Sequence, residues 1–181
     1  MGKDNISLEL FIIKPGVSEK LKDRIIFTLE NNGFDILVNK DVKFSFEDMK
    51  NFYSKKKDEL IEIGKKTIEF AKTNNIDIKK HFTKTTPYEI GKEIMERQAR
   101  YMASGKSTIL LTLREGKNNY EVAKKIVGST YPEKAEKGTI RSWSNDTLYK
   151  ATVENRAIRN LIHSSDKENL AREFEIVNKY I

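Results

Sequence analysis

The stretch LELFIIKPGVSEKLKDRIIFTLENNG, residues 8–33, sets the pattern of the fold. Leu8 to Ile13 is a short apolar run of the kind that forms a buried strand, and the following Pro15-Gly16 pair ends it. Apolar residues then recur at helical spacing until Gly33, which predicts a helix with a glycine stop at its C-terminus. These helical positions are Leu21, Ile25 and Leu29. The segment therefore predicts a strand, a loop and a helix.

The next two segments predict another strand and another helix. Residues 34–44 alternate between apolar and polar side chains, as a half-buried strand does. Ser45, with Asp48 three residues later, is typical of an N-cap, so a helix should begin there.

The second half of the chain repeats this pattern. It predicts a strand at Thr108 to Leu113, a helix over 120–127, a short strand at Ile158 to Ile162 and a final helix around Leu170 and Phe174, with 131–156 irregular and polar. The order strand, helix, strand therefore occurs twice, which predicts an α+β fold of the ferredoxin-like (split βαβ) type. Its antiparallel four-stranded sheet would carry helices on its faces.

A Lys-rich, mostly helical stretch separates the two halves, from Lys55 to Tyr101. We interpret its first part, at about 55–92, as a helical insertion. The whole chain, 1–181, is long enough for one domain with such an insertion, so we expect a single domain.

Composition narrows the possible functions only slightly. Lys and Arg number 34 against 27 Asp and Glu, and the net charge of +7 would attract nucleic acids, nucleotides or an acidic membrane surface. The charges of both signs are interleaved along the chain, which is typical of an ordinary solvated surface. Small phosphorylated ligands are thus as compatible with this charge as nucleic acid is.

The sequence also bears on the compartment. It contains no cysteine, no apolar N-terminal leader and no run near the roughly 20 apolar residues of a membrane span. We expect a soluble, cytoplasmic protein without disulfides or membrane contact.

One glycine motif resembles a phosphate-binding loop but fails the pattern. Ser104 to Thr108 reads SGKST, whereas a P-loop needs a glycine five residues before Gly105, where this chain has Arg100. The apolar run also follows the motif instead of preceding it. We expect a plain turn.

The two histidines differ in their surroundings. His81 stands among lysines in the insertion, where a surface role is expected. His163 directly follows the apolar Leu161-Ile162 pair and precedes small polar residues that can cap a helix. A strand end would hold an imidazole rigidly at the edge of a cleft, which makes His163 the candidate for chemistry, although many such histidines are only rim residues.

Several side chains suited to phosphate accompany His163. Lysine and arginine neutralise phosphate oxygens, while hydroxyl and amide groups add neutral hydrogen bonds. The candidates are Lys14, Tyr53, Thr130, Arg141 and Asn160. Taken singly, each is equally typical of a solvated surface, and spacing alone shows no contact among them.

Three motifs carry a resemblance to a known family. The chain has NLIHSSD at Asn160 to Asp166, GTIR at Gly138 to Arg141 and GSTYP at Gly128 to Pro132, supported by LFIIKP at Leu10 to Pro15. In this order they resemble the nucleoside diphosphate kinase family over nearly the whole chain. The resemblance implies a ferredoxin-like core and an enzyme that moves the γ-phosphoryl group from a nucleoside triphosphate to a nucleoside diphosphate.

The resemblance also implies roles for particular residues. His163 would accept the γ-phosphoryl group and return it, in a ping-pong reaction for which a neutral imidazole is suited. The other implied roles are as follows: Lys14, Tyr53 and Arg141 stabilise the transferring phosphoryl group, Thr130 binds the adjacent phosphate, Asn160 with Lys14 binds the ribose hydroxyls, and Ser165 with Glu173 orients the histidine.

Cofactor and assembly follow from the same resemblance. Mg²⁺ would arrive bound to the nucleotide, with no direct protein ligand and with Asp166 in contact through water. ATP and other nucleoside di- and triphosphates would be the partners, and nucleic acid would not be one. The family's assembly implies a homo-oligomer: a hexamer, a tetramer or a dimer.

Three positions depart from the family pattern. The chain reads Lys-Pro-Gly, ending at Gly16, where the family usually has Lys-Pro-Asp. Lys124 stands in place of a phosphate-binding arginine, and Ile94 stands where relatives have an aromatic residue that stacks on the base. We still assign Lys124 and Ile94 to the nucleotide site. Whether these changes weaken nucleotide binding is left open by the sequence, as are base preference and the role of the insertion.

Two alternatives remain at this stage. The chain could be a catalytically impaired relative that binds nucleotides or proteins, although the intact His163 argues against this. It could also be an RNA-binding ferredoxin-like protein, which would need exposed aromatic residues on the central strands. Those predicted strands contain only Phe11.

Overall fold

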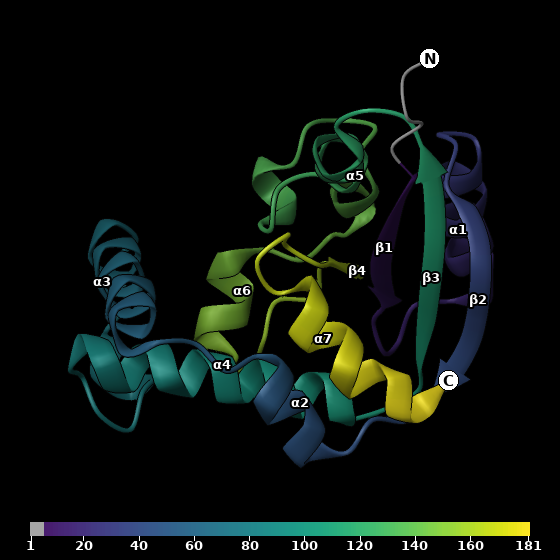
Figure 1. The fold of residues 1–181 in the computed structure, drawn as a ribbon. Coiled ribbons are helices and arrows are strands. Elements are labelled where there is room, and N and C mark those ends of the chain that lie inside the picture. The colour runs from purple at the N-terminus through teal and green to yellow at the C-terminus, as the bar shows by residue number, and fades with distance from the viewer. Residues whose placement is uncertain (1–5) are drawn as a thin grey trace.

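The computed structural model describes residues 6–181, which form one antiparallel sheet with helices around it (Figure 1). The strands are β1 (Ile6–Ile13), β2 (Asp35–Val42), β3 (Ser107–Glu115) and β4 (Ile162–Ser164). The helices are α1 (Glu19–Glu30), α2 (Phe46–Phe52), α3 (Lys57–Thr73), α4 (Pro87–Ala103), α5 (Asn119–Val127), α6 (Leu148–Val153) and α7 (Leu170–Val177). Short 3₁₀ helices are η1 (Ile78–Lys80), η2 (Pro132–Lys134), η3 (Ile140–Trp143) and η4 (Asn178–Tyr180).

The sheet has the strand order β2-β3-β1-β4, and all its pairs are antiparallel. This confirms the predicted four-stranded α+β sheet of ferredoxin-like type. The two central strands pair along their full lengths, from Ile6 opposite Glu115 to Ile13 opposite Thr108. The two edge strands differ, because β2 is long and β4 pairs with β1 over three residues only.

Local signals account for several element ends. Ser45 caps α2 as predicted, and its hydroxyl accepts a hydrogen bond from the Asp48 amide at 3.1 Å. The α1 helix ends at Glu30, and Gly33 then takes a φ of +80°, which glycine adopts without strain. The predicted turn at Gly105 is also confirmed, since it joins α4 to β3.

The last strand was predicted in the wrong place. Instead of running from Ile158 to Ile162, β4 begins at Ile162 and contains His163 at its centre, opposite Ile12. The backbone at Leu161 has a φ of +71°, and the Ile162 amide bonds back to the Asn160 carbonyl at 2.9 Å. This tight turn keeps the residues before Ile162 out of the sheet, so His163 lies within the strand and not after it.

The region expected to be irregular, 131–156, also contains a helix. Thr147 caps α6 by accepting a hydrogen bond from the Lys150 amide at 3.2 Å. The helix is only one and a half turns long, so its apolar spacing was too short to identify from the sequence.

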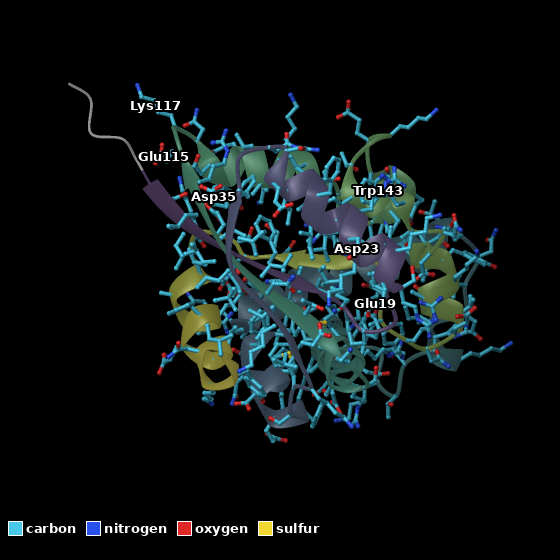
Figure 2. The ribbon with its side chains drawn as sticks, turned by 90° about the vertical axis from the view of Figure 1, so that its right-hand side faces the viewer. Glu19, Asp23, Asp35, Glu115, Lys117 and Trp143 are labelled. Carbon is cyan, nitrogen blue, oxygen red and sulfur yellow. The ribbon has the colours of Figure 1, made fainter. Side chains whose placement is uncertain are left out.

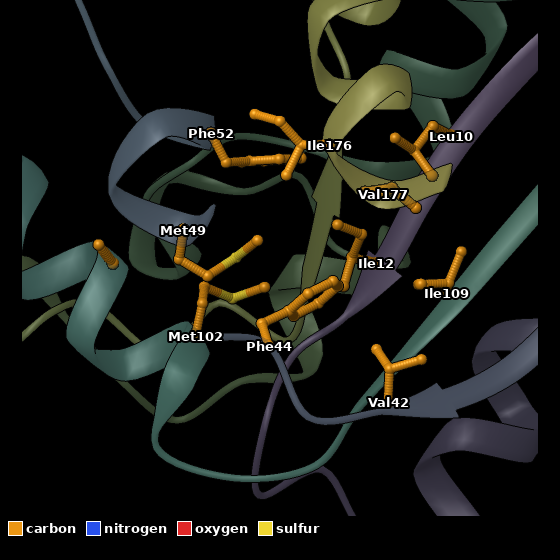
Figure 3. Packing of buried hydrophobic residues seen from close by; sticks show 11 residues of the cluster. Leu10, Ile12, Val42, Phe44, Met49, Phe52, Met102, Ile109, Ile176 and Val177 are labelled. Atoms are coloured by element: carbon orange, nitrogen blue, oxygen red, sulfur yellow. The ribbon is translucent and has the colours of Figure 1, made fainter. Parts of the chain in front are cut away.

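Helices and their connecting loops cover both faces of the sheet. One buried cluster packs α2, α4 and α7 against one face (Figure 3): Leu10, Ile12, Val42, Phe44, Met49, Phe52, Ala99, Met102, Ile109, Ile176 and Val177. The other packs α1, α5 and η3 against the opposite face: Phe11, Ile13, Ile25, Leu29, Phe34, Leu110, Ala123, Val127, Ile140 and Ile162. Phe11 is therefore fully buried and offers no exposed platform for stacking bases.

The side of the sheet that carries α1 is viewed in Figure 2. Glu19 and Asp23 lie on α1, and Trp143 of η3 lies close to the same helix. The guanidinium of Arg24 stacks over the Trp143 ring at 3.9 Å, which ties η3 to α1. This contact anchors the segment that carries Arg141 into the cavity described below.

The Lys-rich stretch forms a pair of long helices, α3 and α4, and α3 lies away from the sheet (Figure 1). Two glycines let these helices touch. A Cβ atom at Gly64 would lie 1.8 Å from the Pro87 carbonyl oxygen, and one at Gly91 would lie 2.0 Å from the Leu60 carbonyl oxygen. In residues 6–181, none of the helices is both long and apolar enough to cross a membrane.

Because the clash at Gly64 is with backbone, Gly64→Ala should force α3 away from α4. We expect the free energy of unfolding to fall by about 1–3 kcal/mol, measured by urea denaturation. Glu69→Ala, on the exposed side of α3, is the matched control and should leave stability nearly unchanged. Equal stability of the two variants would contradict this account of the helix contact.

A second prediction concerns acid stability. Asp48 accepts hydrogen bonds from Lys179 at 2.7 Å, Tyr180 at 2.6 Å and Ser45 at 2.8 Å, which lower its pKa from 3.8 to about 2. A carboxyl whose pKa is lower in the folded state stabilises the fold above its unfolded pKa, and that stabilisation is lost as the pH falls.

Asp48→Asn should therefore be less stable than the wild type near neutral pH. The difference should vanish as the pH falls from 3.8 to about 2. Urea midpoints across this range measure it, with the exposed neighbour Glu47→Gln as control. A difference that stayed constant with pH would show that the charge of Asp48 is not responsible.

Candidate active site

A cavity of about 720 Å³ opens beside β4 and contains His163. Its walls come from the ends of α2 and α5, from α3, α4, η3 and α6, and from the start of α7. The cavity therefore joins both halves of the fold to the stretch that carries α3. His81 lies elsewhere, in a separate open cavity of about 700 Å³, where its Nδ1 is 3.0 Å from Asn155 Oδ1.

The His163 ring is held from behind by a carboxylate. Its Nε2 lies 2.8 Å from Oε2 of Glu173, and the Ser165 hydroxyl donates to the same oxygen at 2.6 Å. Burial alone would raise the pKa of Glu173, but the hydrogen bonds from His163 and Ser165 lower it overall. Glu173 is thus an ionised carboxylate that accepts a hydrogen bond from the protonated Nε2 of His163.

This contact decides which ring nitrogen is free. In residues 6–181, Nδ1 of His163 has no hydrogen-bond partner, and a proton on Nε2 leaves Nδ1 with its lone pair. The rings of Phe52 and Tyr53 contact the imidazole edge-on at 5.0 and 5.8 Å between centroids. An oriented imidazole with one free nitrogen in a cavity can act as a nucleophile.

Two cations, the buried Lys14 and the partly buried Arg141, lie in the same cavity. Lys14 follows β1, and Arg141 of η3 donates to the carbonyls of Ile162 and Gly128 at 3.1 Å. Burial, and secondarily the charge of Arg141, holds the pKa of Lys14 well below its ordinary value, and burial lowers the pKa of Arg141 to about 10. Neither side chain forms an ion pair with a carboxylate in the described part of the chain, so both suit an incoming anion.

The remaining predicted ligands also line this cavity, as Tyr53, Ile94, Lys124, Thr130, Asn160 and Asp166. Asn160 is buried and donates from Nδ2 to the Thr130 carbonyl at 2.8 Å, while its Oδ1 has no partner within residues 6–181. Burial raises the pKa of Tyr53, whose hydroxyl therefore stays protonated. Ser165 is not part of the cavity wall, and its hydroxyl donates to Glu173.

One ion pair stands at the exposed mouth. Lys124 Nζ lies 3.0 Å from Asp166 Oδ1, and the Tyr120 hydroxyl donates to the same oxygen at 2.6 Å. Both charged side chains are more than half exposed, so this pair is weak and easily rearranged. An anion that binds Lys124 competes with Asp166. Gly16, with a φ of +81°, lies in the turn after Lys14 and is not part of the cavity wall.

Some wall residues were not anticipated from the sequence. The stretch with α3 supplies Ile63, Lys66, Thr67 and Phe82, the α6 region supplies Leu148, Ala151 and Thr152, and α4 adds Gln98. Gln98 follows Ile94 by four residues and so shares its helical face, which is the one signal that could have identified it. The others come from elements whose packing the sequence does not specify.

An oriented histidine beside two cations without carboxylate partners in residues 6–181 suits phosphoryl transfer from an anionic substrate, the chemistry of a phosphotransferase. Comparison with known proteins identifies the substrate class. The family model for nucleoside diphosphate kinase matches residues 63–179. The chain belongs to the nucleoside diphosphate kinase family, and its function is nucleotide phosphotransfer.

Individual relatives agree with this assignment. The nucleoside diphosphate kinase of Pyrobaculum aerophilum is 34% identical and covers 90% of this chain and 88% of its own. That of Methanocaldococcus jannaschii is 30% identical and covers 92% of this chain and 89% of its own.

Solved structures give the same result. The NDP kinase structure from Pyrobaculum aerophilum matches with a TM-score of 0.86 at 31% identity and covers 95% of each chain. One from Borrelia burgdorferi, a transition-state mimic with bound vanadate and ADP, has a TM-score of 0.69 at 20% identity over 94% of this chain and 86% of its own. At this low identity, the second match shows only that the two proteins share a fold.

The contact between Glu173 and His163 predicts a loss of activity when the carboxylate is removed. In Glu173→Ala the imidazole would lose the partner that fixes its tautomer, and phosphotransfer from ATP to GDP should slow by about 10- to 100-fold. Glu175→Ala, on the exposed side of the same helix, is the matched control. Equal rates for the two variants would show that Glu173 does not orient the histidine.

Proposed function

We propose that the enzyme works by a ping-pong reaction in which Nδ1 of His163 carries the phosphoryl group. The observation that supports this most directly is that Nε2 faces Glu173 while Nδ1 is free in the cavity. In the first half, the Nδ1 lone pair attacks the γ-phosphorus, and the bond to the β–γ bridging oxygen breaks. The nucleoside diphosphate leaves with that electron pair. In the second half, a terminal oxygen of another diphosphate attacks the phosphorus of the phosphohistidine, the P–N bond breaks, and its electron pair returns to Nδ1.

The cations would stabilise the charge that develops on the phosphoryl oxygens. Phosphoryl transfer depends mainly on positioning and on charge stabilisation by fixed donors. Arg141 lies near enough to Lys14 for its charge to lower the pKa of that lysine, which favours their meeting a shared anion. The Tyr53 hydroxyl would add a neutral donor beside them.

The rest of the nucleotide would follow the cavity away from His163. Asn160 Oδ1 is a buried acceptor without a partner in residues 6–181, so with Lys14 it suits a ribose hydroxyl. Thr130 and Lys124 would bind the phosphate nearer the mouth. The base would lie on an aliphatic wall that includes Ile94, with further contacts from the stretch that carries α3, and apolar contact there does not require an aromatic ring.

Mg²⁺ would enter with the nucleotide. The residues 6–181 contain no group of three or more His, Asp or Glu that could hold a metal ion, and Asp166 is a single exposed carboxylate. This donor set fits an ion that keeps its waters and is held mainly by the substrate phosphates. Asp166 would reach it through water, and the ion would neutralise phosphate charge.

Two alternatives are less well supported. A relative that only binds nucleotides would have no need of a histidine oriented by Glu173 and Ser165. An RNA-binding sheet would need exposed aromatic residues, whereas Phe11 is buried. The ADP and vanadate bound in the Borrelia burgdorferi structure support a nucleotide in the cavity of this chain as well.

We also propose that the chain is one domain with a helical insertion, that it works in the cytoplasm, and that it forms a homo-oligomer. The free edge of β2 supports the last of these, since an unpaired strand edge is a ready site for association. Leu37 on this strand and Phe27 on α1 are 53% and 63% exposed, unusual for large apolar side chains.

The mechanism predicts a covalent intermediate. After incubation with ATP labelled at the γ-phosphate, the protein should carry label that is labile in acid and stable in base, as expected for a phosphoramidate. His163→Ala should carry none and should fail to exchange phosphate between ATP and GDP, whereas the matched control His81→Ala should behave as the wild type. Label that persists in His163→Ala would exclude this mechanism.

A further inference from the structure

Buried polar atoms without partners concentrate in the active-site cavity. Within residues 6–181, five buried side-chain nitrogen or oxygen atoms lack a hydrogen-bond partner: Tyr53 Oη, Gln98 Nε2, Ser107 Oγ, Trp143 Nε1 and Asn160 Oδ1. Three of the five residues, Tyr53, Gln98 and Asn160, line the cavity around His163. A buried donor without an acceptor destabilises the fold, so such a group is retained where a ligand satisfies it.

Gln98 is the one of these three residues with no role so far. It lies on α4, and its amide nitrogen is buried beside the Tyr53 hydroxyl, close enough to lower the pKa of that tyrosine against the larger effect of burial. Neither group completes a hydrogen bond with the other. A tyrosine hydroxyl can also accept, but because neither group has a hydrogen-bond partner within residues 6–181, both are available to donate to an acceptor that enters the cavity.

The position of this pair along the cavity indicates which part of the nucleotide it meets. The Tyr53 ring contacts the His163 ring at 5.8 Å between centroids, and the charges of Glu173 and Arg141 both act on the pKa of its hydroxyl. One turn after Gln98 on α4, the Tyr101 ring lies 5.9 Å from Lys14 Nζ, and its hydroxyl donates to the Pro15 carbonyl at 2.9 Å. Gln98 therefore lies between Ile94, one turn before it on the same helical face, and the Tyr53 side chain that contacts His163.

A phosphoryl oxygen meets the requirement better than the alternatives. It carries negative charge and several lone pairs, so it accepts from more than one donor at once. A ribose hydroxyl must also donate, and the acceptor that suits it is Asn160 Oδ1 and not the Gln98 and Tyr53 donors. A carboxamide adds a hydrogen bond without a further positive charge beside Lys14 and Arg141, whose pKa values are already lowered.

We propose that the Gln98 amide donates to a non-bridging oxygen of the phosphoryl group as it passes to His163, and that the Tyr53 hydroxyl shares this oxygen. Gln98 is then a catalytic residue that contacts the group in transfer. This inference rests on the proposed phosphohistidine mechanism. It adds a neutral donor from α4 to the cationic donors Lys14, just after β1, and Arg141 of η3.

The test compares the rate of phosphohistidine formation with the affinity for ADP, which lacks the transferring group. In rapid-quench single turnovers at saturating ATP, Gln98→Leu should form the intermediate about 10- to 100-fold more slowly than the wild type. Its affinity for ADP should be unchanged. Gln98→Glu should be slower still, because a carboxylate repels the phosphoryl oxygens. Glu96→Gln, on the exposed side of α4, is the control and should match the wild type.

A thermal unfolding scan separates this role from a structural one. Leucine has a similar volume and carries no donor to leave unsatisfied, so Gln98→Leu should be at least as stable as the wild type. Wild-type rates in Gln98→Leu would overturn the inference, since they would mean that only water meets the amide. Weaker ADP binding with an unchanged transfer rate would also overturn it. Absence of label on the wild type would overturn the proposed mechanism, and this inference with it.

Discussion

The site depends on the pairing of a three-residue strand with the end of β1. In this register Ile12 lies opposite His163, while the neighbouring Ile162 joins the buried cluster on the other face of the sheet. Because successive side chains of a strand point to opposite faces, a slip by one residue would turn His163 away from Glu173. The turn at Leu161 prevents such a slip, since its carbonyl accepts from the Lys14 amide at 2.8 Å and brings the lysine next to the histidine.

The positive charge of the site comes from two cations that are shielded from water and are not neutralised by a carboxylate of the described residues. Lys14 and Arg141 are removed from water and placed near each other, and no carboxylate in the described residues forms an ion pair with either. This arrangement destabilises the free protein and strengthens binding of a phosphate-bearing substrate, because interactions in a desolvated site are stronger than in water. Glu173 lies on the Nε2 side of the imidazole, where it holds the ring proton on Nε2 without neutralising the two cations. The Gln98 amide is a neutral example of the same arrangement, since it has no hydrogen-bond partner in residues 6–181 and is available to the substrate.

How much of this was predictable varies from residue to residue. The strand Leu8 to Ile13, the glycine stop at Gly33 and the cap at Ser45 depend on nearby residues, so the sequence predicts them and the structure agrees. The end strand was misplaced because Leu161 adopts a left-handed backbone conformation that its residue type does not suggest. Likewise, α6 is too short for its periodicity to be recognised.

The sequence by itself determined the order of the elements and, through the motif around His163, the residue expected to carry the chemistry. Both are local properties: hydrophobic period, caps and a short run of residues. Only the tertiary structure decided that Nδ1 is the free nitrogen, that Lys14 and Arg141 have no carboxylate partner among residues 6–181, and that α3 and Gln98 reach the cavity. Those facts depend on contacts between residues far apart in the chain, whose geometry is set by the packing of helices on the sheet and not by spacing along the sequence.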